Sequence, residues 1–171
     1  RGSAGDDGSM LHMISAYLTE LRLVLGQEKV DDKSNEITVI PKLLEWLDLK
    51  GNTETIDAMG RQHKIADQIK EKDADYILSL KRNLGTLHED AKLYLDQEKD
   101  NSDIHIERNG EHGRFERRTC YVPTDIQWVK ERHHKWQSVE SIVRIDSERT
   151  IKDKATKETW YFIPSHSLYR T

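Results

Sequence analysis

The alternation of apolar and polar positions predicts strands at both ends of the chain. Residues 13–17 and 21–30 are β-rich runs joined by a short polar segment, which is typical of a hairpin. Near the carboxyl end, residues 139–149 and 158–165 form a second antiparallel pair around the polar turn 150–157. Another β-rich run, residues 114–122, predicts a strand before that pair.

Between these strands the apolar positions follow a helical period in several places. Leu43, Leu44 and Leu47 share one helix face, and Pro41 fits only if it lies in the first turn of that helix. Further predicted helices carry the apolar stripe Ile65, Ala66 and Ile69, a capping box of Thr86 and Glu89 that opens a helix through about Gln97, and a short helix capped by Thr124. Short strands ending at Asp57 and spanning Asp75–Lys81 alternate with these helices, and the polar stretch at about 99–112 predicts a surface loop that holds at most a weak edge strand. This order predicts the α/β class, a mixed β-sheet flanked by helices.

Composition limits the class of protein. A chain of 171 residues with 34% charged residues and scattered apolar residues predicts one globular domain with its own core. No apolar run approaches the roughly 18 to 20 residues of a membrane span, and the first residues lack the apolar stretch of a secretory signal. The single cysteine, Cys120, is best interpreted as a small apolar filler in a strand, so a reducing cytoplasm is the expected compartment.

The formal net charge of −4 excludes a uniformly basic nucleic-acid binder, so any DNA contact must be local. The basic concentrations are His112, Arg114, Arg117 and Arg118, and then Lys130, Arg132, His133, His134 and Lys135. Their interleaved aromatic residues, Phe115, Trp128 and Trp136, are typical of a nucleic-acid surface. The alternative is a solvated charged face over aromatic core residues.

Asp57 is the strongest candidate for chemistry by position alone. It closes the short apolar run Thr55-Ile56 and is followed by small residues, so it is expected at the carboxyl edge of a sheet, where α/β proteins bind ligands. A carboxylate there can reach a divalent metal from a rigid backbone. The alternative is that Asp57 caps the amino end of the next helix.

Seven segments together resemble the H-repeat-associated and related insertion-sequence transposases. They are LHMISAY, LVLGQEKVDDKSNEITVIPKLL, LDLKGNTETIDAMGRQHKIADQI, DADYILSLKRN, TLHED, EHGRFERR and ETWYFIPS, in this order from Leu11 to Ser165. The resemblance implies an RNase H-like fold and DNA cleavage and strand transfer by Mg²⁺ (or Mn²⁺) ions held by an Asp-Asp-Glu triad. It assigns Asp57 the role of the second Asp and of a metal ligand.

The resemblance places the other two acids outside this chain. The family's first Asp precedes an Arg-Gly-Ser segment, which here is Arg1-Gly2-Ser3, although a cloning remnant is the alternative interpretation. The third acid belongs to a His-Trp-x-x-Glu-Asn motif that does not occur here. We therefore expect a partial RNase H-like core over 1–171 that is inactive alone.

Glu116 is the internal candidate for a substitute catalytic acid, because it lies in the family segment EHGRFERR. Strand alternation puts Arg114, Glu116 and Arg118 on one face, and a ladder of surface ion pairs explains that pattern equally well. A nuclease that uses Glu36 and Glu116 beside Asp57 would require these three carboxylates to converge.

Other segments of the resemblance suggest contacts around the site. Asn35 and Glu36 are candidates for site-proximal residues, with turn and helix-end roles as the alternative. Lys81, Arg82 and Asn83 are candidate DNA-binding residues together with His112 and the three arginines at 114, 117 and 118. The family usually has Gly and Gln where this chain has Arg82 and Leu84, which favours a decayed or repurposed copy that only binds DNA or protein. The partners we expect are DNA, at insertion-sequence ends and target, and further copies of the chain.

Overall fold

The computed structural model describes residues 12–30, 36–57, 62–111, 114–152 and 154–168. The elements in chain order are β1 (His12–Leu18), β2 (Leu23–Val30), α1 (Glu36–Trp46), β3 (Thr53–Ile56), α2 (Gln62–Glu71), β4 (Asp75–Ser79), η1 (Arg82–Leu84), α3 (Thr86–Gln97), η2 (Lys99–Asn101), β5 (Ser102–Glu111), β6 (Arg114–Pro123), α4 (Gln127–Arg132), β7 (Val143–Ile151) and β8 (Lys154–Pro164). None of the helices in these ranges is long and apolar enough to cross a membrane.

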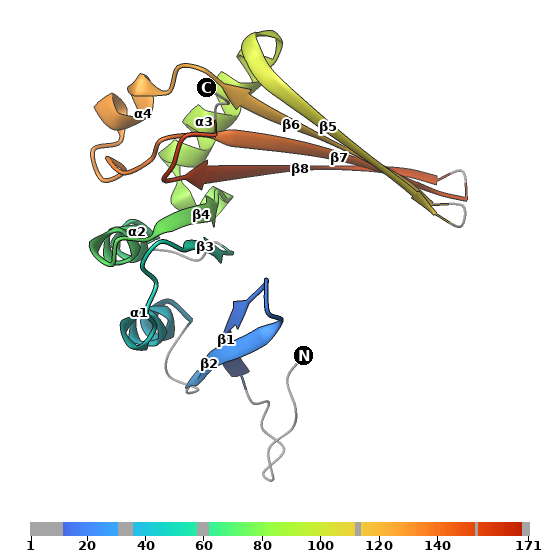
Figure 1. The fold of residues 1–171 in the computed structure, drawn as a ribbon. Coiled ribbons are helices and arrows are strands. Elements are labelled where there is room, and N and C mark those ends of the chain that lie inside the picture. Colours follow the sequence, from blue (N-terminus) through green and yellow to red (C-terminus); the bar gives the residue numbers. More distant parts are fainter. Residues whose placement is uncertain (1–11, 31–35, 58–61, 112–113, 153, 169–171) are drawn as a thin grey trace.

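A six-stranded sheet forms the centre of the molecule (Figure 1). Its strand order is β3-β4-β8-β7-β6-β5, in which β3 and β4 are parallel and the other neighbours are antiparallel. The predicted α/β class with a mixed, helix-flanked sheet is confirmed, and it is consistent with an RNase H-like DDE transposase domain.

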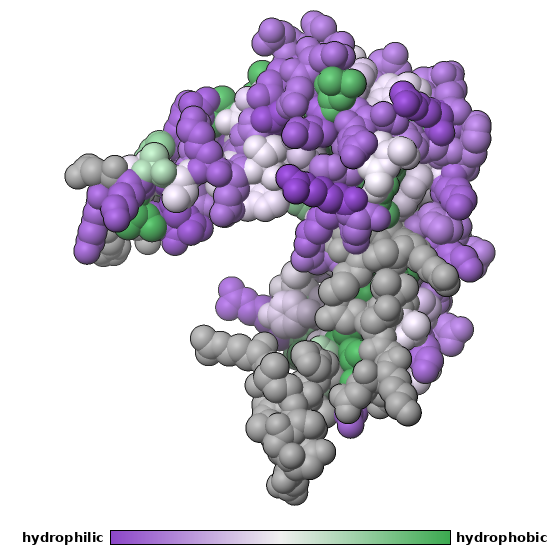
Figure 2. All heavy atoms as spheres, turned by 180° about the vertical axis from the view of Figure 1, so that it is seen from behind, coloured by the Kyte–Doolittle hydropathy of each residue, from purple (hydrophilic) through white to green (hydrophobic). Residues whose placement is uncertain are grey.

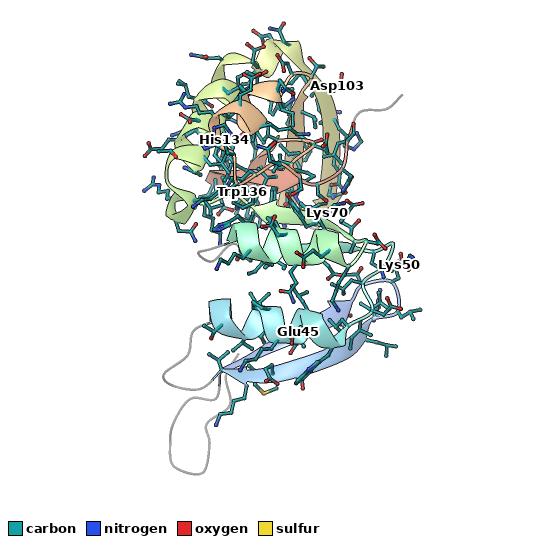
Figure 3. The ribbon with its side chains drawn as sticks, turned by 90° about the vertical axis from the view of Figure 1, so that its left-hand side faces the viewer. Glu45, Lys50, Lys70, Asp103, His134 and Trp136 are labelled. Atoms are coloured by element: carbon teal, nitrogen blue, oxygen red, sulfur yellow. The ribbon has the colours of Figure 1, made fainter. Side chains whose placement is uncertain are left out.

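Strands β1 and β2 form the predicted hairpin, but they pair only with each other in the described chain. From the resemblance we expected Asp57 at the end of a central strand with this hairpin beside it. Both expectations are wrong within the described residues, where β3 is an edge strand. The hairpin packs on α1, where a Cβ on Gly26 would come 3.1 Å from Leu43 Cδ1. Figure 3 shows α1, which carries Glu45, between this hairpin and α2.

The core lies between the sheet and helices α2 and α3. Ile69 of α2, Leu78 of β4 and Ile163 of β8 have no exposed surface, and Leu87 and Leu95 of α3 are almost as deeply buried. Removal of these side chains from water is the main favourable contribution to folding. This core fixes β4, and with β4 it fixes the parallel neighbour β3.

Several local predictions were wrong for identifiable physical reasons. The polar segment expected as a surface loop with at most a weak edge strand is the ten-residue edge strand β5, and its edge position explains why it tolerates polar side chains. Gly85, not a threonine side chain, precedes α3, with a positive φ of 56°. Pro41 lies inside α1, beyond its first turn, and Thr124 does not cap α4, since Asp125 Oδ1 accepts the Gln127 backbone N–H instead.

Strands β5 to β8 continue well beyond the helices and form a long projecting arm (Figure 1). From behind, the same arm projects from a surface on which hydrophilic residues predominate (Figure 2). Near the far end of the arm, apolar residues such as Phe115 and Ile151 are exposed beside many charges.

Candidate active site

Asp57 directly follows β3 at the carboxyl edge of the parallel pair. Ile56 pairs with Leu78 of β4, so the residues that follow both strands leave the sheet side by side. The Asp57 side chain is 78% exposed, and its Oδ1 forms an ion pair with Lys81 Nζ at 2.6 Å. The predicted position at a strand end is confirmed. The helix-cap alternative is not tested, because residues 58–61 lie outside the described part of the chain.

The described residues around Asp57 do not by themselves make a metal site. No group of three His, Cys, Asp or Glu side chains suited to a metal ion occurs among them. A pair of catalytic metal ions needs several carboxylates, whereas the charged neighbour that the structure gives Asp57 is a lysine.

Glu116 of β6 is enclosed by arginines. Its side chain is only 8% exposed, with Arg114 Nη2 at 2.6 Å, Arg118 Nη2 at 2.7 Å and Arg149 Nη2 at 3.7 Å. The hydrogen bond from Arg114 is the main cause that lowers the pKa of Glu116, and the charges of the other two arginines act in the same direction. These contacts match the ion-pair ladder that the sequence left open as an alternative.

The sheet register separates Glu116 from Asp57. Glu116 lies opposite Arg149, which lies opposite Thr156 of β8, whereas β4 pairs with β8 only at 162–164. Six residues of strand at ~3.3 Å each amount to roughly 20 Å, before the width of the intervening strands is added. The structure therefore does not bring these two carboxylates together.

The segment of Lys81, Arg82 and Asn83 lies beside Asp57, as the sequence suggested. It leaves β4, turns through η1 and forms one wall of a cavity of about 730 Å³. The rest of the lining comes from β4, α3, β7 and β8: Ser79, Leu80, His88, Lys92, Asp96, Arg144, Thr159, Trp160 and Tyr161. Lys81 thus links the cavity to the Asp57 carboxylate.

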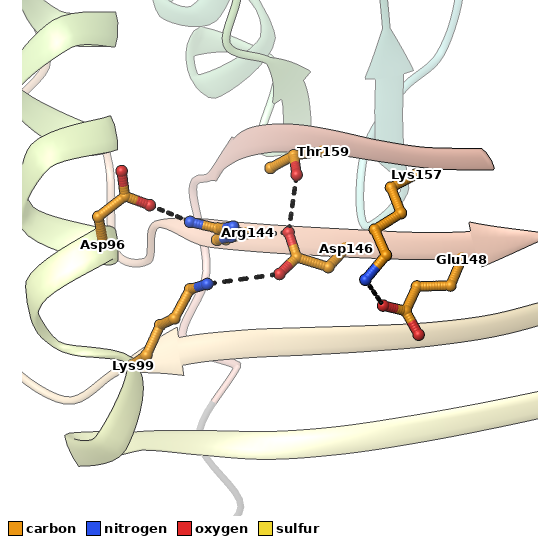
Figure 4. A network of polar contacts seen from close by, with 7 residues as sticks. All are labelled: Asp96, Lys99, Arg144, Asp146, Glu148, Lys157 and Thr159. Atoms are coloured by element: carbon orange, nitrogen blue, oxygen red, sulfur yellow. Dashed lines mark hydrogen bonds and ion pairs between the residues drawn. The ribbon is translucent and has the colours of Figure 1, made fainter. Parts of the chain in front are cut away.

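A polar network that the sequence analysis missed supports one side of this cavity (Figure 4). Arg144 is held between Asp96 and Asp146, with its Nε 2.7 Å from Asp146 Oδ1. Burial alone would raise the pKa of Asp146, but hydrogen bonds from Arg144 and Thr159 lower it overall. The period-two pattern of β7 placed Arg144 and Asp146 on one face, yet it gave no indication that α3 would supply Asp96.

Most of the predicted basic surface is already paired. Lys130 Nζ lies 2.5 Å from Glu140 Oε1, and Asp90 accepts both Arg132 Nε at 3.1 Å and His133 Nε2 at 2.9 Å. Trp136 is buried and Trp128 is half-buried in the core, so the core interpretation of these aromatics fits better. Asn35 and His112 lie outside the described residues, and Glu36 is described only as the first residue of α1.

Comparison with known proteins shows the family to which this chain belongs. The family model described as "Transposase DDE domain" matches residues 2–163. A Xanthobacter autotrophicus protein named for the dhlA 3' region is 37% identical over 98% of this chain, and the H repeat-associated proteins YhhI and YbfD of Escherichia coli K12 are 37% and 41% identical over 92% and 68%. The chain covers 57%, 44% and 48% of these relatives, or about half their length. No solved structure matches. By this match over nearly its whole length, the chain belongs to the DDE-domain transposase family.

Proposed function

We propose that this chain is part of the catalytic core of a DNA transposase and that Asp57 is one of its three catalytic acids. The observation that carries the proposal is the exposed carboxylate at the carboxyl edge of β3, in a chain that belongs to the DDE family. The full-length parent would cleave and join DNA with Mg²⁺ or Mn²⁺ ions. Its other two acids would lie upstream of Arg1 and downstream of Thr171.

The unpaired edges of the two sheets are an argument that the full-length parent has an additional strand between them. Within the described residues β3 is unpaired on one side, and β1 pairs only with β2. Isolated hairpins are marginally stable, and neighbouring strands lie about 4.8 Å apart. A strand inserted between β1 and β3 would join the hairpin to the main sheet. An acid at its end would then stand beside Asp57.

A binding-only domain is the second candidate, and two observations favour it for the chain by itself. The charged neighbour of Asp57 in the structure is Lys81, and Glu116 is committed to its arginines. Arg82 and Leu84 also depart from the family pattern in the loop beside the site. In this case the chain would bind DNA or protein without chemistry.

The test compares the 171-residue chain with a version extended at both ends by the segments that carry an upstream Asp and a downstream Glu. Each is assayed for Mg²⁺- and Mn²⁺-dependent DNA cleavage and joining, with Asp57→Asn in both and Asp67→Asn, an exposed residue of α2, as the matched control. We expect no activity from the short chain, because loss of a metal that stabilises the leaving oxygen removes orders of magnitude in rate. The extended chain should be active, and Asp57→Asn should lower its rate at least about a thousandfold.

Two results would contradict the proposal. Metal-dependent cleavage by the short chain that Asp57→Asn abolishes would mean that the acids within these residues suffice. An extended chain that binds DNA but has no activity would favour the binding-only domain.

A further inference from the structure

Strand β5 runs along one edge of the projecting arm (Figure 1). Within the described residues it pairs only with β6, along its whole length and without a register shift. Every second backbone N–H and C=O group of β5 points to the outer side, where the described chain offers no partner strand. Proteins commonly protect such an edge with a lysine, a proline or a bulge, and β5 has none of these. Among the described residues, this edge is therefore open to a further strand.

Two isoleucines of β5 are left in contact with solvent. Ile104 is 54% exposed and Ile106 is 38% exposed, and the register with β6 puts both on the face that carries Thr119 and Tyr121. A strand that packed beside β5 would remove part of this apolar surface from water, which is favourable. The edge thus offers a partner both hydrogen-bonding groups and apolar surface.

The charges of β5 decide which strand fits beside it. His105 and Glu107 lie on the face opposite the two isoleucines, and neither His105 nor Arg108 forms an ion pair with another described residue. Glu107 is 53% exposed, and its nearest cation, Arg118 Nη1, is 3.9 Å away. A partner strand should therefore place a carboxylate opposite His105 and a cation opposite Glu107. An antiparallel copy of β5 itself carries both in the required order.

One symmetric register satisfies these charges. When two identical strands pair antiparallel about a twofold axis, one residue lies opposite its own copy, and its neighbours pair in mirrored order. Glu107 or Arg108 on the axis would place like charges opposite each other, and His105 there would place Asp103 opposite Glu107 of the second copy. With Ile106 on the axis, His105 lies opposite Glu107 of the second copy, and the two Ile106 side chains meet.

We propose that β5 is a self-association surface, through which two copies of this chain pair antiparallel about a twofold axis at Ile106. Residues 102–110 of both copies would pair over roughly 30 Å, with about eight backbone hydrogen bonds, and the two sheets would become one. On one face each His105 contacts Glu107 of the second copy, and on the other Ile104 packs on the aliphatic stem of Arg108 of the second copy. The inference does not depend on the catalytic assignment of Asp57, so its failure would leave the proposed function standing.

Sedimentation equilibrium of the 171-residue chain measures the self-association. The paired strip is narrower than a standard interface, so we expect a dimer with a dissociation constant on the order of 10 to 100 µM. Ile106→Lys places two like charges opposite each other on the axis and should weaken the dimer at least about tenfold. Ile151→Lys, at a 44% exposed isoleucine of β7, is the matched control and should change the constant by less than about twofold.

Two results of this experiment would overturn the inference. One is a chain that stays monomeric at concentrations well above the expected constant. The other is a dimer that Ile106→Lys and Ile151→Lys weaken equally, because the contact would then lie elsewhere. A circular-dichroism melt of each variant excludes unfolding as the cause.

Disulfide cross-linking reports the register directly. In a Cys120→Ser background, Ile106→Cys places two thiols opposite each other with their Cα atoms about 4.5 to 5.5 Å apart, a distance that a disulfide spans. Glu107→Cys is the matched control, because its two copies would lie about 8 Å apart. Mild oxidation should link the first variant into dimers and leave the second monomeric. Equal cross-linking of the two variants would contradict the proposed pairing.

An exchange of charges tests the contact between His105 and Glu107. His105→Glu or Glu107→Arg alone removes the complementarity at both symmetric contacts, so each should weaken the dimer about fivefold. The double variant has opposite charges in exchanged order, so its dissociation constant should return to within about twofold of that of the unchanged chain. Losses that simply add in the double variant would show that these side chains do not meet.

A segment of the full-length parent is the other strand that could cover β5. Cross-linking of Ile106→Cys in the chain extended at both ends separates the two occupants, because a covered edge cannot reach a second copy. We expect the extended chain to cross-link as the 171-residue chain does. Loss of the cross-link in an extended chain that still cleaves DNA would assign the edge to the parent's own segment and overturn the inference, while the proposed function would stand.

Discussion

At the scale of single residues, two carboxylates of this chain have opposite surroundings. The Asp57 carboxylate is largely exposed to solvent and forms an ion pair with Lys81. The Glu116 carboxylate is removed from solvent and accepts two short arginine hydrogen bonds, so its capacity is already used. Both side chains are carboxylates. Their burial and their arginine partners, and not their chemistry, decide which of the two can take part in a site.

The arginine contacts of Glu116 predict a pH-dependent stability. Because Arg114 and its neighbours hold the pKa of Glu116 below its usual value, the stabilisation is complete above that usual value. It is lost as the pH falls through the lowered pKa, because the unfolded chain takes up the proton first. Glu116→Gln should lower the free energy of unfolding at pH 7 and flatten its decline below about pH 4.5.

Urea unfolding at pH 7 and at acidic pH measures both effects. Glu158→Gln, at an exposed glutamate of β8, is the control and should change neither. An equal loss of stability in the two variants would mean that the arginines around Glu116 contribute nothing specific.

At the scale of elements, the hairpin β1-β2 depends on its contact with α1. Leu43 is 5% exposed and meets the hairpin at Gly26, where the absence of a side chain permits the close approach. Leu43→Ala should therefore cost about 2 to 5 kcal/mol of this local stability. Hydrogen exchange should show faster exchange of the β1 and β2 amides, while β4 amides stay protected.

The matched control for this prediction is Leu93→Ala, because Leu93 of α3 is 60% exposed. Leu93→Ala should not measurably change the hydrogen exchange of the hairpin amides. If Leu43→Ala left the hairpin amides protected as well, the contact between α1 and the hairpin would not be what stabilises it.

Elements with a clear periodicity of apolar residues could be predicted from the sequence. Elements that form because of their pairing with other strands could not. The spacing of the leucines in α1 and of the apolar residues in α2 predicts helices, because a helix that buries one face has apolar residues three and four positions apart. Strand β5 has no such pattern, since its hydrogen bonds to β6 and its edge position make it a strand without an apolar face. The start of α3 was misassigned because Gly85 can adopt a positive φ, which the adjacent Thr86 signal obscured.

At the scale of the whole molecule, the strand order is what local pattern could not provide. The sequence predicted that Asp57 closes a strand, and this is confirmed, but the distance to Glu116 depends on the register through β7 and β8. Long-range pairing is set by the summed packing of all elements, so no single segment encodes it. The candidate site is accordingly predictable as a residue and a strand end, whereas the cavity of α3, β7 and β8 emerges only from the assembled chain.

The net charge is −4, and most basic side chains are paired. Two surfaces are therefore the candidates for the DNA-binding face. On β6, Arg114 and Arg118 form ion pairs with Glu116, whereas Arg117 forms no ion pair with another described residue. Beside Asp57, Arg82 and Lys92 line the cavity and form no ion pair with another described residue, and Lys81, which pairs with Asp57, adjoins them. The second surface should therefore supply most of the phosphate contacts.

This difference predicts how duplex affinity depends on salt. Each phosphate contact contributes about 0.9 to the slope of log affinity against log salt concentration, because it releases counterions. The double change Lys81→Gln and Arg82→Gln should reduce that slope by up to about 2, whereas Arg117→Gln should reduce it by about 1 or less. Anisotropy titrations of a labelled duplex from about 50 to 200 mM salt measure the slopes. A larger effect of Arg117→Gln would move the DNA-binding face to the projecting arm, and a slope of zero in the unchanged chain would mean that this part of the transposase does not bind the DNA backbone.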